Sequence, residues 1–399
     1  ITLVDGETLR QAQRRVSLAE SLAQVPGVTV LDRQNYAQDL QIQSRGFGAR
    51  SSFGIRGIKL IIDGIPASAA DGQGQAASFP LDALDRIEVL RGPLALQYGN
   101  AAGGVIVGYT DLEKKRGKSF DLWGAEQGTH RVAAGFDGAS DNDSLRWRVN
   151  ANRFSSDGER MHSEVQRSQL NAIAQWRPRE GERIRLVLNS LSQPDTQDPL
   201  GLTRQALRTN PNGTDAAALI FNTRKSIENH QVGLQWDNKY ASGRRAWLGF
   251  HYIERDILQF LALPVGAQIP ASSAGGVIDL GRRSNGIAAG HQWSGARGAF
   301  MLGFEAGHLQ EARSGYENFL GNQVGVRGRL RRDEANRVSN REIYAIGDWN
   351  PAKGWSMLSA VRHSHINFKS DDQYFANGNG NDSGQLSFKE SSLSFGVTR

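Results

Sequence analysis

Apolar and polar residues alternate with a period of two along most of the chain from Ser119 onward. Leu145, Trp147 and Val149, for example, alternate with arginine and asparagine. The same alternation recurs in the segments 169–176, 245–252, 299–306 and 342–349. Because successive side chains of a strand point to opposite faces, the pattern predicts strands with one apolar and one polar face. Such strands form either a half-solvated sheet or a transmembrane barrel with lipid outside and water inside.

The spacing of these segments favours the barrel. About a dozen alternating segments are separated by short and long gaps in turn, as in barrels that carry tight turns at one end. Short turns are expected at 178–181 and 242–243, and long loops at 192–227 and 258–283. Several aromatic residues near strand ends predict a girdle at the membrane interface. They are Trp147, Trp176, Trp236 and Trp349.

Composition excludes several other classes of protein. The mean hydropathy is −0.47, and no run approaches the roughly 20 apolar residues that a membrane-spanning helix needs. The chain has no cysteine, which excludes a disulfide framework and a thiolate metal site. The net charge of +6 is dispersed among acidic residues without a basic face. We therefore expect no nucleic-acid partner.

A glycine-punctuated stretch from Gln41 to Val105 precedes the alternating region. It contains, in order, Q-I-Q-S-R-G-F-G-A-R, I-K-L-I-I-D-G-I-P, D-A-L-D-R-I-E-V-L-R-G-P and Q-Y-G-N-A-A-G-G-V. Strands are expected at 41–47, 58–63 and 86–90, and a short helix at 81–84. Upstream, Ser17 and Glu20 form the pattern of a capping box at the start of a helix. These elements predict a small α+β domain rich in tight turns.

This order of motifs resembles the plug domain of TonB-dependent outer-membrane receptors. The resemblance implies an α+β plug inside a transmembrane antiparallel β-barrel, which has roughly 22 strands in plugged transporters. It places the plug at 1–112 and the N-terminal part of the barrel at 113–399, with the charged run 113–118 as the linker. About a dozen strands correspond to roughly the first half of a barrel, so the chain is expected to be truncated in the C-terminal half.

Further segments look like the YncD-type receptors of this family, which are similar to ferric-siderophore transporters. They are 35–42, 45–57, 71–75, 201–203, 222–225, 274–280, 315–319 and 379–384. The resemblance implies TonB-dependent uptake of a scarce anionic nutrient, either pyrroloquinoline quinone or a ferric siderophore-type chelate. It also implies a monomer in the Gram-negative outer membrane, in contact with lipopolysaccharide and with TonB and its inner-membrane energising complex.

Two plug loops are the expected ligand contacts, because in the family their apices face the outer vestibule. Arginine and serine bind carboxylates, and phenylalanine stacks on flat rings. The expected contacts are Arg50, Ser51, Ser52, Phe53, Asp71, Gln73 and Gln75. The alternative is that glycine and serine are there only to shape the turns.

Other polar residues have a structural and a functional interpretation. The family pattern makes Arg45 and Arg91 a latch to barrel glutamates, whereas otherwise they are surface arginines. The inward-facing arginines predict either a positive funnel for an anion or pairs with plug and neighbouring carboxylates. They are Arg146, Arg148, Arg183, Arg185 and Arg245. His363 and His365 share a strand face, but no third metal ligand is evident, so we expect no metal site.

Two other kinds of function remain open. Long loops at 192–227 and 258–283 are compatible with a surface receptor for phage, bacteriocins or host molecules. A soluble β-rich carbohydrate-binding protein would also have half-polar strands. The chain lacks the G-x-S-x-G, H-E-x-x-H and P-loop motifs, so we expect no enzyme and no cofactor.

Overall fold

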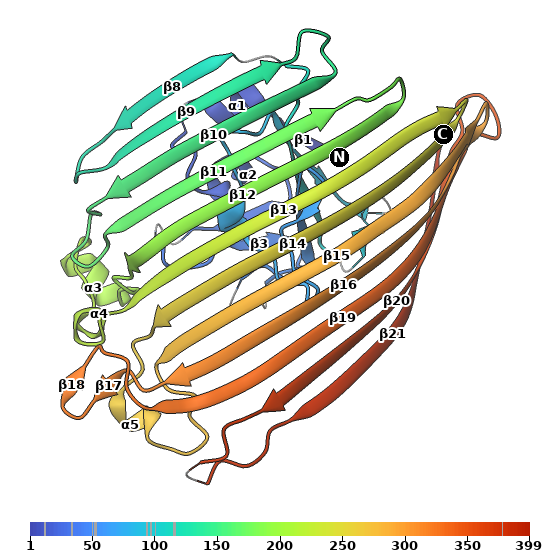
Figure 1. Ribbon diagram of the computed structural model, residues 1–399. Coiled ribbons are helices and arrows are strands. Elements are labelled where there is room, and N and C mark those ends of the chain that lie inside the picture. The colour runs from blue at the N-terminus through green and yellow to red at the C-terminus, as the bar shows by residue number, and fades with distance from the viewer. Residues whose placement is uncertain are drawn as a thin grey trace.

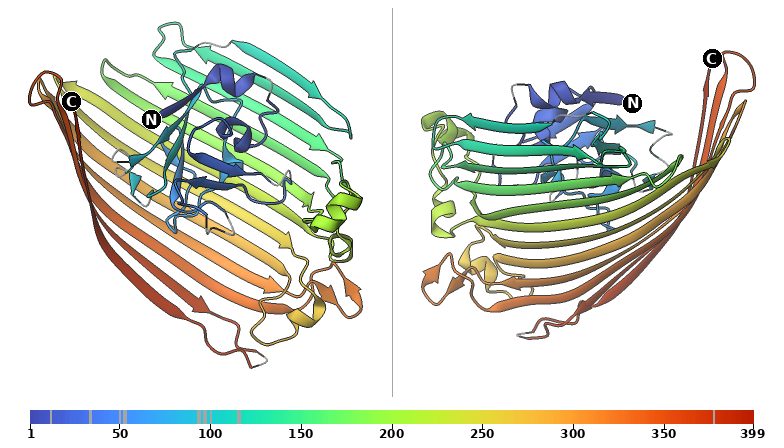
Figure 2. Two further views of the ribbon diagram at one scale, coloured as in Figure 1. Left: turned by 180° about the vertical axis from the view of Figure 1, so that it is seen from behind. Right: turned by 45° about the horizontal axis from the view of Figure 1, so that its top comes forward.

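The computed structural model contains a small N-terminal domain on the concave side of a large curved sheet (Figures 1 and 2). The residues that it describes are 1–11, 13–32, 35–49, 51, 54–92, 95, 98–99, 101–114, 117–376 and 378–399. A mixed sheet with short helices is followed by an antiparallel sheet, so the predicted fold class is confirmed.

The N-terminal domain is built on a five-stranded sheet in the order β1-β6-β7-β4-β5. The strands are β1 (Thr2–Asp5), β4 (Ile58–Ile62), β5 (Ile65–Pro66), β6 (Arg86–Leu90) and β7 (Gly104–Tyr109). A separate pair consists of β2 (Val28–Leu31) and β3 (Gln41–Ser44). The helices are α1 (Gly6–Arg10), α2 (Leu18–Leu22) and the 3-10 helix η1 (Ala76–Ser78). β4 and β7 run parallel, and the other pairs are antiparallel.

Burial of β4 and β7 explains their continuous apolar sequences. Leu60 and Val105 are completely buried, because Leu60 packs in a cluster with α1 and α2, and Val105 packs in a second cluster with Leu90, Ala95 and Ala101. The capping box at the start of α2 is present, with Ser17 and Glu20 both bonded to backbone amides. The helix expected at 81–84 is wrong. The segment forms turns instead, with backbone bonds from Leu81 N to Phe79 O and from Ala83 N to Pro80 O.

The large sheet has twelve strands, and each pairs antiparallel with its neighbour in the chain. They are β8 (Lys118–Gly124), β9 (His130–Ala139), β10 (Leu145–Ser156), β11 (Val165–Trp176), β12 (Glu182–Gln197), β13 (Arg224–Ala241), β14 (Arg244–Phe260), β15 (Val277–Gly295), β16 (Gly298–Tyr316), β19 (Leu330–Trp349), β20 (Ser356–Asp372) and β21 (Gly384–Thr398). The prediction of about a dozen strands is therefore confirmed.

Several strands extend beyond the alternating segments, and the loops between them are shorter than expected. The loop predicted at 192–227 is 198–223, and the loop predicted at 258–283 is 261–276. In β12 and β13 the added residues, 192–197 and 224–227, are polar apart from Pro194 and Ile227. So few apolar residues leave no period-two pattern, and the sequence pattern stops before the strand does.

The connections alternate in length between the two ends of the sheet. One end has short turns, such as 177–181 and 242–243. The other end has long loops that contain α3 (Arg204–Thr209), α4 (Ala216–Ile220), α5 (Val265–Gln268), β17 (Phe319–Leu320) and β18 (Gln323–Val324). Transmembrane barrels place short turns in the periplasm and longer loops outside, which orients this sheet. None of the described residues forms a helix that is long and apolar enough to cross a membrane.

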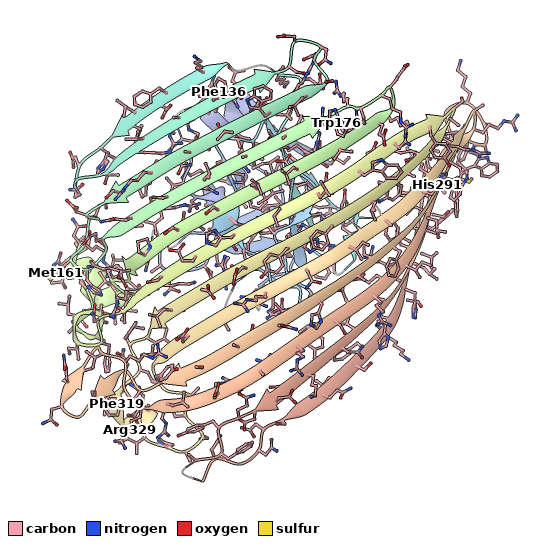
Figure 3. The ribbon with its side chains drawn as sticks, in the orientation of Figure 1. Phe136, Met161, Trp176, His291, Phe319 and Arg329 are labelled. Atoms are coloured by element: carbon pink, nitrogen blue, oxygen red, sulfur yellow. The ribbon has the colours of Figure 1, made fainter. Side chains whose placement is uncertain are left out.

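The convex face of the sheet carries an exposed apolar belt. Its residues include Leu186, Leu188, Leu234, Leu248, Phe250, Ile287, Leu302, Phe304, Ile343 and Leu393. The predicted girdle tryptophans lie at the short-turn end of this belt, where Figure 3 labels Trp176. The concave face is polar and lies against the N-terminal domain. Lipid-facing and lumen-facing residues therefore alternate along each strand, as in a membrane barrel.

We predict that a charged substitution on the convex face destabilises the folded barrel only where it lies within the apolar belt. Leu302→Arg places a cation near the middle of the belt and should destabilise the folded barrel by about 2–4 kcal/mol. His308→Arg, higher on the same face of β16, should cost only about 0–1 kcal/mol. Equilibrium folding of the complete receptor into lipid vesicles measures both costs. Equal costs for the two variants would contradict this placement of the belt.

Candidate functional site

The N-terminal domain and the barrel wall approach so closely that a side chain in place of one barrel glycine would force a plug side chain to move. A Cβ on Gly233 of β13 would lie 2.0 Å from Ile65 Cδ1 of β5. Ile65 and Leu112 also form a buried cluster with Ile173 and Val187 of the barrel. The plug is thus packed directly on the inner face of the wall, and this contact defines the positions of its loops.

Arg148 of β10 is the most deeply buried charge at this contact. Its guanidinium is completely buried and donates to Asp85 Oδ2 at 2.5 Å and to both oxygens of Asp137 at 2.8 and 2.9 Å. It also donates to the carbonyl oxygens of Ala83 and Lys114. One barrel arginine therefore holds the segment before β6 and the chain that leaves the plug. A buried charge in such a position is tolerated only with partners of this kind.

A second buried cluster lies beside the first. Asp82 of the plug accepts from Arg131 of β9 and from Asn152 of β10, and lies 3.2 Å from Arg15. Arg15 and Arg131 also share Asp121 of β8. Because the two arginines share the two carboxylates, the removal of any one member leaves the cluster with an unbalanced charge.

The plug is also paired with strands on the other side of the sheet. Arg282 of β15 donates to Asp71 Oδ2 at 2.6 Å and to Gln73 Oε1 at 2.8 Å. Lys225 of β13 donates to Asp39 at 2.9 Å. Burial alone would raise the pKa of the Asp39 carboxyl, but the charges of Lys225 and Arg255 hold that pKa below its usual value. Asp39 is therefore an anion that depends on the barrel.

One plug lysine belongs to a network of barrel charges. Lys59 of β4 donates to Glu305 of β16, and Arg362 of β20 bonds Glu305 at 2.9 Å and Glu342 at 2.6 Å. A cavity of about 210 Å³ lies beside this network, between β4 and the barrel wall. Lys59 also donates to Tyr98 O at 2.7 Å. In the pair of Lys59 with Glu305 the cation is on the plug, as it is in the pair of Arg15 with Asp121 and unlike the pairs of Arg148, Arg282 and Lys225.

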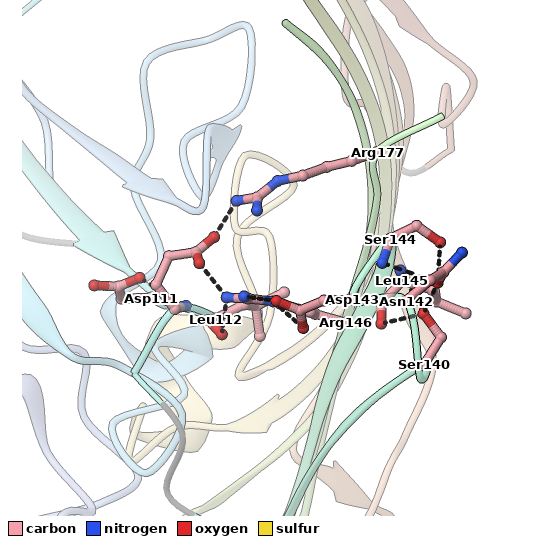
Figure 4. Close-up of polar contacts among 10 residues, drawn as sticks. Asp111, Leu112, Ser140, Asn142, Asp143, Ser144, Leu145, Arg146 and Arg177 are labelled. Carbon is pink, nitrogen blue, oxygen red and sulfur yellow. Dashed lines mark hydrogen bonds and ion pairs between the residues drawn. The ribbon is translucent and has the colours of Figure 1, made fainter. Parts of the chain in front are cut away.

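Pairing, rather than a free positive funnel, describes the predicted lumen arginines. Arg148 pairs with the plug, Arg183 and Arg245 share Asp237, and Arg185 donates to Gln175. Arg146 pairs with Asp143 and with Glu113. Figure 4 shows Arg146 and Arg177 extending from the barrel towards the 111–114 segment, where both bond to Glu113. The interpretation as pairs with plug and neighbouring carboxylates is confirmed for Arg146, Arg148, Arg183 and Arg245, whereas Arg185 bonds to an amide.

A cavity of about 960 Å³ opens between the plug and strands β8–β12 at the long-loop end. Plug residues in 13–20, Asp32, residues in 35–40 and residues in 74–77 form one wall. The barrel wall comprises β8, the 125–129 turn and the loop between β10 and β11. Small-molecule sites have volumes of roughly 300–1,000 Å³, so the cavity admits a large ligand.

Aromatic and amide side chains supply the uncharged lining of this cavity. Tyr36 packs on the buried ring of Phe154 with 5.2 Å between ring centroids, and Trp123 lies under the guanidinium of Arg14. Burial raises the pKa of the Tyr36 hydroxyl, although its hydrogen bond with Arg14 opposes this, so Tyr36 is neutral at physiological pH. Gln75 and Gln38 contribute amides. The lining can therefore stack on a flat group and donate hydrogen bonds.

The charged lining does not select an anion by itself. It includes Glu20, Asp32, Asp39, Glu126 and Glu159 beside Arg14, Arg160 and Arg167. Arg160 donates to three loop carbonyls and Arg167 to two plug carbonyls, so both already hold protein groups. Arg14 is the exposed cation on the described wall.

The structure separates the predicted ligand residues into two groups. Gln75 lines the cavity. Asp71 and Gln73 instead contact Arg282, and the Ser51 hydroxyl donates to Gly54 O at 2.7 Å. Arg50, Ser52 and Phe53 lie outside the described residues.

The predicted latch arginines have different surroundings. Arg91 donates to Pro26 O and to Thr2 Oγ1, both in the plug. Arg45 is exposed in the turn after β3. Their pairing with barrel glutamates stays a prediction. His363 and His365 bond to Ser391 and Ser387, and no cluster of three or more metal-ligating side chains occurs among the described residues.

Sequence reasoning missed Tyr36, Trp123 and Arg14 as cavity residues. None belongs to a motif, and they come from two plug segments and a barrel strand. Trp123 had a weak signal, because it lies in the first alternating strand with its ring on the concave side. Only the curvature of the sheet around the plug brings these residues together.

Comparison with known proteins identifies the plug. Residues 1–105 match the family model described as TonB-dependent Receptor Plug Domain. The ferric enterobactin receptor of Pseudomonas aeruginosa is 25% identical over 183 residues, which are 40% of this chain and 23% of that receptor. The hemin receptor of Yersinia pestis is 29% identical over 114 residues, 28% of this chain and 16% of that receptor.

Solved structures share the fold along nearly the whole chain. The unliganded ferric citrate transporter FecA superposes with a TM-score of 0.80 over 99% of this chain and 60% of its own, at 16% identity. The ferric yersiniabactin uptake receptor FyuA of Yersinia pestis gives 0.74 over 99% of this chain and 61% of its own, at 15% identity. The chain thus spans about three fifths of these structures, and its matches cover less than a quarter of the curated relatives above.

The match confirms the predicted location. TonB-dependent receptors are outer-membrane proteins of Gram-negative bacteria, and they are transporters rather than enzymes. The twelve strands correspond to part of such a receptor's barrel.

The buried pairs predict that the plug depends on barrel arginines. Arg148→Leu leaves Asp85 and Asp137 without their shared cation and should destabilise the plug by about 3–5 kcal/mol. Hydrogen exchange of the β6 amides in the complete receptor measures this free energy. Arg185→Leu is the matched control, because Arg185 faces the same lumen but, among the residues that the structure describes, bonds to the amide of Gln175 and to no carboxylate. If both variants exchange like the unsubstituted receptor, the buried pair does not hold the plug.

Proposed function

We propose that this chain, which belongs to the TonB-dependent receptors, binds a scarce nutrient in the 960 Å³ cavity and passes it inward when TonB rearranges the plug. The observation that carries the proposal is the position of the cavity. It opens at the long-loop end, and plug residues form one wall and barrel residues the other. A ligand there touches both parts, so its binding is coupled to any movement of the plug.

The proposed cargo is a ferric chelate of the siderophore type. The curated relatives include a ferric enterobactin receptor and a hemin receptor, whose cargoes carry flat rings around iron. Tyr36 and Trp123 offer faces for such rings, and Gln38, Gln75 and Arg14 offer donors for their oxygens. Pyrroloquinoline quinone, implied by the resemblance to YncD-type receptors, is the second candidate cargo. Pyrroloquinoline quinone is also flat. However, it has more carboxylates than the described cavity lining has cations that are free to bind them.

The remaining site assignments extend the same proposal. Arg50, Ser51, Ser52 and Phe53 directly precede Gly54 and Ile55 of the cavity lining in the sequence, so we assign them to the ligand-facing surface of the plug. Asp71 and Gln73 couple the plug to the barrel, because a movement of the neighbouring plug loop reaches β15 through their bonds to Arg282.

The proposed domain boundary lies between residues 112 and 113. β7 ends at Tyr109 and β8 begins at Lys118, and Leu112 still packs with Ile65 of the plug. Glu113 is held by Arg146 and Arg177 at the short-turn end. The partners we assign are TonB with its energising complex on the periplasmic side, and the receptor acts as a monomer.

A second function is favoured by the long loops. Asn318 is completely buried and bonds to Gln268, Phe221 and Leu261, so three loops form one rigid platform. Exposed apolar side chains on these loops are Leu207, Leu219, Ile220, Ile269 and Leu320. A preorganised apolar surface suits a protein partner, such as a phage tail protein or a bacteriocin. This use is compatible with transport.

Calorimetric titration of the complete receptor tests the cargo. The panel is ferric enterobactin, ferric citrate, hemin and pyrroloquinoline quinone. We expect a ferric chelate to bind most tightly, and Tyr36→Ala or Trp123→Ala to weaken it by about 1–1.5 kcal/mol, roughly tenfold. Trp349→Ala is the control, because Trp349 is an exposed girdle residue at the opposite end.

Two results would contradict this assignment. If pyrroloquinoline quinone alone binds tightly, the proposed cargo is wrong but the proposed site is not contradicted. If both cavity variants bind the ligand with unchanged affinity, the proposed site is wrong. Uptake of the bound ligand by cells with and without TonB then separates a transporter from a passive surface receptor, because only transport requires TonB.

A further inference from the structure

Arg255 of β14 is a buried cation on the lumen face of the barrel, and one edge of its guanidinium is unoccupied. The residue is 3% exposed, and its Nε and Nη2 atoms are buried without a hydrogen-bond partner. Its Nη1 atom lies 3.5 Å from the amide oxygen of Asn229. A buried charge with so few contacts destabilises the fold unless an anion compensates it, so the position calls for a functional explanation.

Other lumen arginines show which group this edge binds. In Arg148, Nε and Nη2 donate to the two oxygens of Asp137 at 2.9 and 2.8 Å. In Arg362, the same two atoms donate to Glu342 at 2.6 Å and to Glu305 at 2.9 Å. Two parallel N–H groups match the two oxygens of a carboxylate. The unoccupied edge of Arg255 therefore has the geometry of a carboxylate site.

The plug carboxylates around this site are bonded to other cations. Asp39 accepts a hydrogen bond from Lys225 at 2.9 Å, and Asp71 accepts one from Arg282 at 2.6 Å. Among the residues that the structure describes, no carboxylate forms an ion pair with Arg255. Arg282 lies directly opposite Arg255 on the neighbouring strand. Like charges in this arrangement repel each other, so an anion at Arg255 would also reduce that repulsion.

Arg255 lies at the level of the wall that separates the two cavities. It shares a row with Asn229 of β13 and Arg282 of β15. Two residues closer to the long loops, Ile227 of β13 lines the 960 Å³ cavity. Two residues closer to the short turns, Ser284 of β15 lines the 210 Å³ cavity. A molecule that moves along the wall from one cavity to the other therefore passes Arg255.

A plug hairpin forms the other side of this partition. Residues 67–75 form a hairpin that is closed by backbone hydrogen bonds. Gly74 of the hairpin lines the larger cavity, and Gly72 lines the smaller one. The tip of the hairpin is bonded to Arg282 through Asp71 and Gln73. The hairpin and its bonds to the wall thus keep the two cavities separate.

We propose that Arg255 binds a carboxylate of the cargo during its passage from the larger to the smaller cavity. This inference rests on the proposed function and narrows the cargo to flat ferric chelates that carry carboxylates, the chemical class of hemin. Displacement of the 67–75 hairpin breaks its bonds to Arg282 and opens the Nε–Nη2 edge of Arg255. The cargo carboxylate then accepts two parallel hydrogen bonds from this edge. Arg255 does not line the larger cavity, so it determines specificity in transport and not in the first binding step.

TonB-dependent uptake by cells that produce the complete receptor tests the inference with two probes, hemin and hemin dimethyl ester. Hemin carries free carboxylates, and the ester carries none. The unsubstituted receptor should take up hemin about tenfold faster than the ester, and Arg255→Met should take up both at the slower rate. Arg255→Lys keeps the charge without the fork, so it should retain a difference of about threefold. Calorimetry should give Arg255→Met an affinity for hemin within about twofold of the unsubstituted value, because Arg255 lies outside the larger cavity.

Arg185→Met is the matched control. Arg185 also faces the lumen, but its Nε and Nη2 atoms already donate to Gln175. It lines neither cavity. This variant should keep the tenfold difference between the two probes.

Equal uptake of the two probes by the unsubstituted receptor would overturn the inference. So would a tenfold difference that persists in Arg255→Met, or one that is also lost in Arg185→Met. Faster hydrogen exchange of the amides of 35–40 in Arg255→Met would show that Arg255 holds the plug through Asp39 and does not serve the cargo. If Arg255→Met does not fold, an undiminished difference in Arg255→Lys would overturn the inference.

A failure of this inference can be distinguished from a failure of the proposed function. If hemin is not taken up but another chelate of the calorimetric panel binds in the larger cavity, only the carboxylate site is contradicted. If no chelate binds, both the carboxylate site and the proposed function are contradicted.

Discussion

Buried ion pairs between barrel arginines and plug aspartates are the constraint on which the rest of the structure depends. Arg148 is completely buried and holds Asp85, and Arg131 holds Asp82. A charge in this environment is stable only with its partner, so each pair specifies one position of the plug against the wall. Close packing, such as that of Ile65 on Gly233, excludes alternatives that differ by a side chain. The cavity at the long-loop end has a defined shape for this reason.

Two groups of charged contacts attach the plug to the barrel. Towards β8–β10 the plug is held by aspartates in buried arginine clusters. Towards β15–β20 it is held through Arg282 and through Lys59, which is part of a network with Glu305. The cavity lies beside the first group, and the smaller cavity lies beside Lys59. Ligand contact and plug release can therefore use different sets of charges, which suits a receptor that must hold its cargo before it lets the cargo pass.

Sequence predicted the fold better than the site. The order of motifs in 41–105 predicts the plug, and the period-two alternation predicts the strands, because both depend on local geometry. The extended ends of β12 and β13 were missed, since Pro194 and Ile227 are the apolar residues there and they make no alternating pattern. The site depends on residues far apart in the chain: Arg148 and Asp85 are 63 residues apart, and Tyr36, Trp123 and Gln75 meet only through the curvature of the sheet. Contacts between residues so far apart in the sequence leave no spacing pattern from which they could be predicted.

The most direct measurement of the central claim is hydrogen exchange of the complete receptor with and without its bound nutrient. If the cargo lies between plug and wall, the amides of 32–40 and 74–77 should become protected, together with those of the 125–129 turn, while the buried strand β4 exchanges as before. Protection confined to the loops 198–223 and 261–276 would contradict the account, because it would place the ligand on the outer platform and not in the cavity that the plug helps to form.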